Sequence, residues 1–222
     1  MVPYGKQGKE VFGISESVAS FYRKARRLAL FTIFYNILEG IVSVYFGVED
    51  ETIALFGFGL DSFVEVMSGL GIYLGIRRME GEEFKGTYRF EKLALRITGS
   101  AFYILSAGLF ATAFLNAYFG RKPETTIIGI VISIVSILTM ALLMKAKLSV
   151  GNILGSEAIV EDAHCTRACM YLSFILLLSS LGYEIFGLGL IDSLGAAGIA
   201  YHALKEGKEA FEKAKKVEDS PS

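Results

Sequence analysis

Long apolar runs, separated by short polar segments, make up most of the chain. Six of them are long enough to cross a hydrocarbon core of about 30 Å, which takes about 20 helical residues. They occupy residues 28–47, 52–76, 95–119, 126–144, 157–181 and 185–204. Because a segment in lipid must satisfy its backbone hydrogen bonds internally, each run is expected to be a helix. The pattern predicts an all-α membrane protein with one six-helix transmembrane domain over residues 28–204.

The composition agrees with this pattern. Of the 222 residues, 53% are hydrophobic and a further 24 are glycine, whereas soluble domains reach about 45–50% with glycine included. The net charge of −1 gives no basic field that would attract nucleic acid, and two cysteines are too few for a disulfide scaffold. The first ten residues lack the apolar core of a secretory signal. We expect a multi-pass protein of the cell membrane whose partner is the lipid bilayer.

The basic residues predict the orientation of the chain. All but three of the 22 lysines and arginines fall on one side of the six spans. Lys145 and Lys147 are counted on that side, as residues that follow the fourth span. Since basic residues accumulate on the cytoplasmic side, both termini are expected there. Residues 1–27 would form a cytoplasmic amphipathic arm, and residues 205–222 a short charged cytoplasmic tail.

Two pairs of chemically active residues lie inside the predicted spans. Asp61 and Glu65 stand one helical turn apart in the second span, and Cys165 and Cys169 stand one turn apart in the fifth. Both pairs fall near the middle of the bilayer, where ionisable residues are costly and therefore functional candidates. The two spans hold matching places in the first and second half of an inverted three-helix repeat, a plan common in transporters. Two carboxylates and two thiols at one depth could meet as four metal ligands.

Each of these residues also has a purely structural interpretation. Cysteine packs well as a small hydrophobe, and the two acidic residues could pair with Arg167 as structural ions. Arg167, however, projects about 180° from the cysteine pair on an ideal helix. His164 points about 120° away from the cysteines on the same helix and is expected to pack, or to stand behind the metal ligands, rather than to be a ligand itself.

Other polar residues within the spans are weaker candidates. In the first span Thr32, Asn36, Glu39 and Ser43 share one helical face. Glu39 would either line the same pathway or hydrogen-bond a neighbouring helix. Asp192, near the outer end of the sixth span, is expected to serve helix packing.

At these residues the chain resembles the cation diffusion facilitator family of divalent-metal transporters. That family has six spans and a four-residue metal site made of i,i+4 pairs on spans two and five, usually His or Asp with Asp. Asp61 and Glu65 fall on the span-two pair, and Cys165 and Cys169 on the span-five pair. Asp162 falls on the acidic position that precedes the latter. Cysteines therefore stand where the family usually has His and Asp.

The resemblance implies a secondary transporter that moves a divalent transition metal out of the cytoplasm, and not an enzyme. The four paired residues would bind the metal, with Asp162 as an acid on the path into the site or beside its ligands. Thiolates and carboxylates together suit Zn²⁺ first, with Cd²⁺, Co²⁺ or Fe²⁺ as alternatives. Metal/proton antiport and a homodimer are expected, and no resident cofactor. The family's cytoplasmic domain after span six has no counterpart, as in a short branch.

Two other functions remain open from the residues alone. A membrane metal sensor or scaffold would bind the ion without moving it. A membrane dithiol oxidoreductase would cycle Cys165 and Cys169 between thiols and a disulfide. This second alternative leaves Asp61 and Glu65 unexplained, and a disulfide between residues one helical turn apart would be strained.

Overall fold

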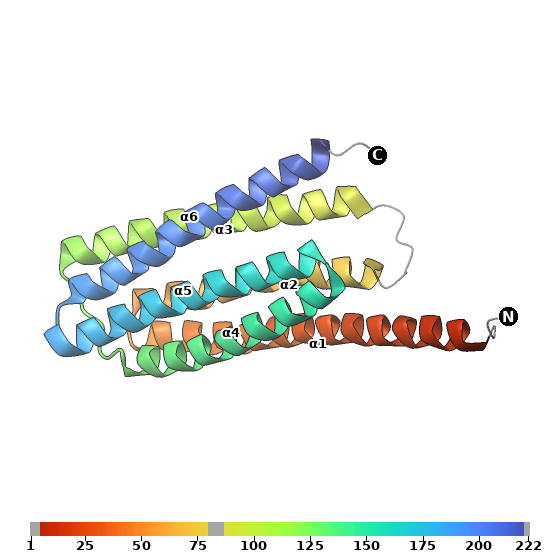
Figure 1. Ribbon diagram of the computed structural model, residues 1–222. Helices are drawn as coiled ribbons and strands as arrows, with labels where there is room; N and C mark the ends of the chain where they lie inside the picture. The colour runs from red at the N-terminus through yellow and green to blue at the C-terminus, as the bar shows by residue number, and fades with distance from the viewer. Residues whose placement is uncertain (1–4, 80–86, 220–222) are drawn as a thin grey trace.

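A computed structural model describes residues 5–79 and 87–219 of the chain (Figure 1). Within these residues the fold is six helices without a strand, which confirms the predicted all-α class. The helices are α1 (Gly5–Glu49), α2 (Ile53–Met79), α3 (Thr87–Phe119), α4 (Ile127–Leu154), α5 (Glu157–Phe186) and α6 (Gly189–Asp219). Each predicted span corresponds to one helix, and most helices run further than the apolar pattern indicates.

Glycine ends two of the helices of the second half. Gly155 follows α4 with φ +59°, and its N–H donates to the carbonyl of Asn152. Gly187 follows α5 with φ +65°, and its N–H donates to the carbonyl of Tyr183. A left-handed residue after the last helical turn is strained for any residue with a Cβ, so glycine is favoured there. Short turns of this kind make consecutive helices antiparallel.

The helices form one antiparallel bundle. α1 packs along α2, α4 along α5, and α3 along α6. α2 also contacts both helices of the α3–α6 pair, and α5 also contacts α6. The start of α1 and the end of α6 lie at the same end of the bundle (Figure 1). We call this the terminal end and the opposite one the far end. The main core joins α2, α3, α5 and α6; its largest buried side chains include Leu55, Phe58, Phe102, Leu109, Leu176 and Ile199.

The outer surface of the bundle is apolar, as contact with lipid requires. Five helices, α1 to α5, are long and apolar enough to cross a membrane within the part of the chain that is described. Large hydrophobic side chains point outward from them; among the most exposed are Phe34, Ile104, Phe114, Leu142 and Leu178. α6 does not reach the same hydropathy, because its second half is charged. A sixth crossing and the cytoplasmic location of the termini stay predictions.

The structure corrects the sequence-based interpretation of the flanks. α1 begins at Gly5, so the arm and the first span form one continuous helix; the side chains before Ala19 lie outside the described residues. α4 continues to Leu154 instead of ending near residue 144. Lys147 therefore lies inside α4 and is 1% exposed. Lys147 thus does not follow the fourth helix but belongs to it, where an acidic partner on α5 allows its charge to be buried; the side of the membrane on which it lies stays a prediction.

Candidate metal site

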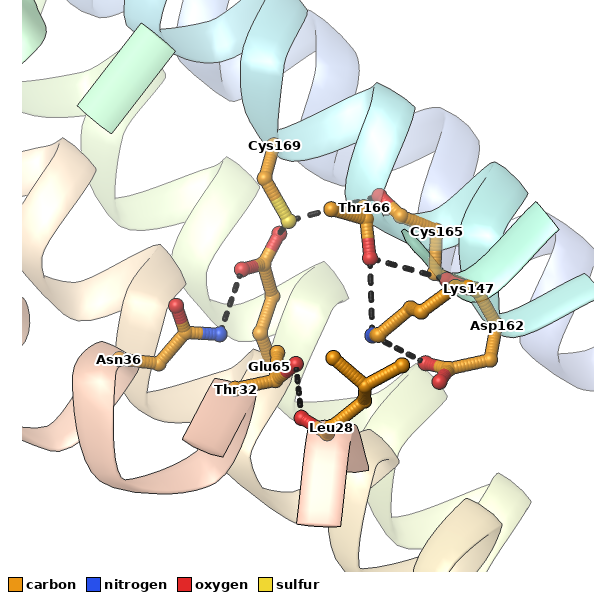
Figure 2. Close-up of polar contacts among 9 residues, drawn as sticks. All are labelled: Leu28, Thr32, Asn36, Glu65, Lys147, Asp162, Cys165, Thr166 and Cys169. Carbon is orange, nitrogen blue, oxygen red and sulfur yellow. Dashed lines mark hydrogen bonds and ion pairs between the residues drawn. The ribbon is translucent and has the colours of Figure 1, made fainter. Parts of the chain in front are cut away.

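Glu65 of α2 is the centre of the polar cluster inside the bundle (Figure 2). Its Oε1 accepts a hydrogen bond from the Cys169 thiol of α5 at 2.6 Å, and its Oε2 accepts one from Asn36 Nδ2 of α1 at 3.1 Å. The Cys169 sulfur also packs beside Met140 and Leu143 of α4. One carboxylate thus joins three helices, and a carboxylate of the second span lies against a thiol of the fifth.

A small cavity of about 50 Å³ adjoins this cluster. A water molecule needs about 10–15 Å³ of such space, so the cavity has room for a small ion and water. Cys165 lines it together with Glu65 and Cys169, which places both cysteines on the predicted face of α5. The lining comes from five helices: Thr32, Asn36, Glu65, Gly69, Phe102, Asp162, Cys165, Thr166, Ala168, Cys169 and Glu206.

Asp61 lies one turn from Glu65 on α2 but does not line the cavity. Its side chain is 2% exposed, and its Oδ1 has no hydrogen-bond partner among the described residues. Such a group is costly to bury and rare in folded proteins. No three His, Cys, Asp or Glu side chains within the described parts of the chain are grouped closely enough to hold a metal. The structure therefore brings Glu65, Cys165 and Cys169 to one cavity and leaves Asp61 beside it.

Asp162 also lines the cavity, and one oxygen of its carboxylate is bonded to a lysine. Lys147 Nζ of α4 donates to Asp162 Oδ1 and to Thr166 Oγ1, each at 2.9 Å. Thr166 Oγ1 in turn donates to the Asp162 carbonyl at 3.0 Å. Figure 2 shows the ammonium group between these two side chains of α5. The acidic residue that precedes the cysteine pair is thus held in a buried ion pair between α4 and α5.

The remaining polar candidates take structural positions. Glu39 accepts hydrogen bonds from Tyr35 Oη at 2.9 Å and from Ser62 Oγ at 3.2 Å. Because Ser62 belongs to α2, Glu39 bonds a neighbouring helix, which is one of the two alternatives predicted for it. Asp192 of α6 accepts from the backbone N–H groups of Ile53 and Ala54, at 2.9 and 3.3 Å. It caps the first turn of α2, which confirms its helix-packing role.

His164 and Arg167 lie apart from the cavity, as their helical angles predict. His164 is half-buried, and Arg167 is exposed on the outer surface of α5. Neither side chain lines the cavity that holds the two cysteines. Arg167 is therefore placed badly to neutralise Asp61 or Glu65.

Sequence reasoning missed Lys147 and Glu206. Lys147 had a detectable signal, because it continues the buried stripe of α4, whose members recur every three or four residues: Gly129, Ser133, Ser136, Met140, Leu143, Lys147 and Val150. Glu206, on α6, lines the cavity. Its neighbours Glu209 and Glu212 form exposed i,i+4 ion pairs with Lys205 and Lys208, at 3.8 Å each. Glu206 had the same kind of signal, because it stands three residues after Ala203 and four before Ala210, both buried on α6.

An apolar helical bundle with carboxylate and thiol side chains buried around an internal cavity has the features of a membrane transporter of cations. Residues 27–216 match the cation efflux transmembrane domain. The chain belongs to this family, which confirms the resemblance to cation diffusion facilitators. It is also similar to a Methanocaldococcus jannaschii protein that is named an uncharacterized transporter, with 26% identity over 86% of this chain and 67% of that one. The protein is therefore a multi-pass membrane protein and a cation transporter.

Proposed function

We propose that the protein exports a divalent transition metal from the cytoplasm in exchange for protons, with Zn²⁺ as the first candidate. Glu65, Cys165 and Cys169 would bind the ion, and Asp61 would complete the site by turning towards it. Two thiolates and two carboxylates form a tetrahedral set with soft and hard donors, which suits Zn²⁺ better than Mg²⁺. The family supports cation transport, and the donor chemistry of this cavity is the reason for the choice of metal.

The contact between Cys169 and Glu65 is the observation on which the exchange with protons rests. The Cys169 thiol donates to the Glu65 oxygen across 2.6 Å. Metal binding requires a thiolate, so the same two atoms hold either a proton or the metal. Release of the metal on the far side would let the proton return. The proton and the metal therefore compete for one site, which is the basic requirement of an antiporter.

The transport step would move the two halves of the bundle against each other. Glu65 belongs to the first three helices and Cys169 to the last three. A site built across two inverted halves opens to one side or the other as the halves rock. Binding that links the halves would then be followed by release when they separate.

The test is uptake into vesicles by the purified protein, with Zn²⁺, Cd²⁺, Co²⁺, Mn²⁺ and Mg²⁺, while internal pH is followed with a dye. We expect uptake of Zn²⁺ with opposite proton movement, and no Mg²⁺ uptake. Binding of the metal without any uptake into the vesicles would contradict transport and favour the membrane metal sensor or scaffold. Thiol oxidation cycles without metal would favour the oxidoreductase.

Two substitutions locate the site. Asp61→Asn removes a charge without changing shape, and Cys165→Ser replaces a soft donor by a hard one; each should abolish Zn²⁺ uptake in a folded protein. Because the ligands act as a unit, the double variant should be little worse than either single one. His164→Gln, on the same helix but away from the cavity, is the control and should retain uptake. Undiminished uptake in both single variants would contradict the shared site.

A further inference from the structure

Lys147 is the largest fully buried side chain in the described part of the bundle. Its ammonium group donates to Asp162 Oδ1 and Thr166 Oγ1 at 2.9 Å each, and both partners lie on the cavity side of α5 (Figure 2). Desolvating two charges costs about as much as their attraction returns, so a buried ion pair is weak evidence of a purely stabilising role. Its position beside the cavity indicates a role there.

Asp162 is the residue whose availability this ion pair controls. It lines the same cavity as Cys165, which lies three residues further along α5. Residues three apart lie on the same side of a helix. Without a cation beside it, the Asp162 carboxylate would offer hard oxygen donors to an ion that the two thiols and Glu65 hold. The ion pair with Lys147 thus determines whether the Asp162 carboxylate is free to bind a metal in the cavity.

We propose that Lys147 withholds Asp162 from the metal and so sets the preference of the site for thiophilic ions. This inference rests on the proposed function. Carboxylate oxygens favour ions such as Mn²⁺, whereas thiolates favour ions such as Cd²⁺ and Zn²⁺. With Asp162 held by Lys147, two of the four proposed donors are thiols, and the site favours softer metals more than it would with Asp162 as a further carboxylate donor. Lys147 is a positioning residue that acts on the metal through Asp162.

The experiment measures the dissociation constants of Mn²⁺ and Cd²⁺ by calorimetry on the full chain in detergent. Lys147→Met keeps most of the length and apolar volume of the side chain and removes its charge. We expect the affinity for Mn²⁺ to rise relative to Cd²⁺ by about 10-fold, because the released carboxylate adds a hard oxygen donor to the site. Lys145→Met removes an exposed lysine from the same helix and should leave the ratio unchanged.

A second substitution tests whether the shift passes through Asp162. In Lys147→Met/Asp162→Asn the released carboxylate is absent, so the ratio of the two affinities should return to the wild-type value. A ratio that stays shifted would overturn the proposal, because another group would then supply the donor. An unshifted ratio in folded Lys147→Met would overturn it as well.

The double variant Lys147→Met/Asp162→Asn, which leaves no unpaired buried charge, keeps the proposal testable if Lys147→Met fails to fold. Since Asp162 is withheld in the wild type, the double variant should lose far less Cd²⁺ affinity than Cys165→Ser does. A loss as large as that of Cys165→Ser would make Asp162 a ligand and overturn the proposal. Wild-type protein that binds neither metal would overturn the proposed function and this role together. If the wild type binds Cd²⁺ but Lys147→Met keeps the wild-type ratio of Mn²⁺ to Cd²⁺ affinity, only the role of Lys147 is overturned.

Discussion

The far end and the middle of the bundle treat acidic groups in opposite ways. At the far end, Asp192 of α6 accepts hydrogen bonds from the first two N–H groups of α2. Glu184 of α5 likewise accepts from the N–H of Thr126 at 2.7 Å, just before α4. In the middle, Asp61 leaves Oδ1 without a hydrogen-bond partner among the described residues, and Glu65 accepts from a thiol.

The difference separates acidic residues that build the fold from acidic residues available for chemistry. A carboxylate at a helix N-terminus satisfies backbone donors that have no partner within the helix, and the helix dipole favours its charge. The two caps do this for one helix in each half of the bundle. An acidic group buried without such donors costs free energy, and proteins keep such groups chiefly at functional sites. The substitutions below test this division.

Glu65→Gln should have the largest effect on function and little effect on folding. The amide keeps an oxygen that can accept from Asn36, but it cannot supply a negative charge to a metal. We expect Zn²⁺ affinity to fall by more than about 100-fold, beyond the effect of residues behind a ligand. Calorimetry in detergent measures the affinity, and thermal unfolding of the metal-free protein measures stability. A stable variant with near wild-type affinity would remove Glu65 from the site.

Asp192→Ala should have the opposite profile. It leaves the buried N–H groups of Ile53 and Ala54 without their acceptor, which we expect to cost about 2 kcal/mol of unfolding free energy. Zn²⁺ affinity of the remaining folded protein should stay at the wild-type value. Asp192→Asn, which retains one carbonyl oxygen, is the matched variant and should lose less stability. A metal-affinity loss equal to that of Glu65→Gln would contradict the division between caps and site.

The difference between the acidic groups that cap helices and those of the polar cluster also bears on what could be predicted from the sequence. The six helices, the all-α class and the shared face of Cys165 and Cys169 follow from local rules of length and helical period, and the structure agrees with them. Asp192 was placed correctly because its position near a span end limits its partners. The burial of Lys147 was missed because lysines near a span end were counted as residues outside the helix, although its place in the apolar stripe of α4 was available.

Contacts between distant segments were beyond such rules. The pairing of Glu65 with Asn36 depends on how α1 lies against α2, and that of Lys147 with Asp162 on how α4 lies against α5. Glu206 stands in line with buried Ala203 and Ala210 of α6, but only the packing of α6 brings it to the cavity. Asp61 was expected among the ligands on the basis of its spacing from Glu65; the bundle places it beside the cavity, so its role stays a prediction.

Glu184→Gln should give the smallest effect of the series. Glu184 caps α4 as Asp192 caps α2, but its side chain is exposed, so water can replace a lost hydrogen bond. The Gln oxygen can still accept from the N–H and hydroxyl of Thr126, which lie 2.7 and 3.0 Å from the Glu184 oxygen. Only the interaction of the charge with the helix dipole is lost, which is worth about 0.5 kcal/mol at the surface. Thermal unfolding at low and high salt measures it: the difference from wild type should shrink in high salt, where exposed charges are screened. A salt-independent loss as large as that of Asp192→Ala would mean that Glu184 acts as a buried group, and the two caps would then be equivalent.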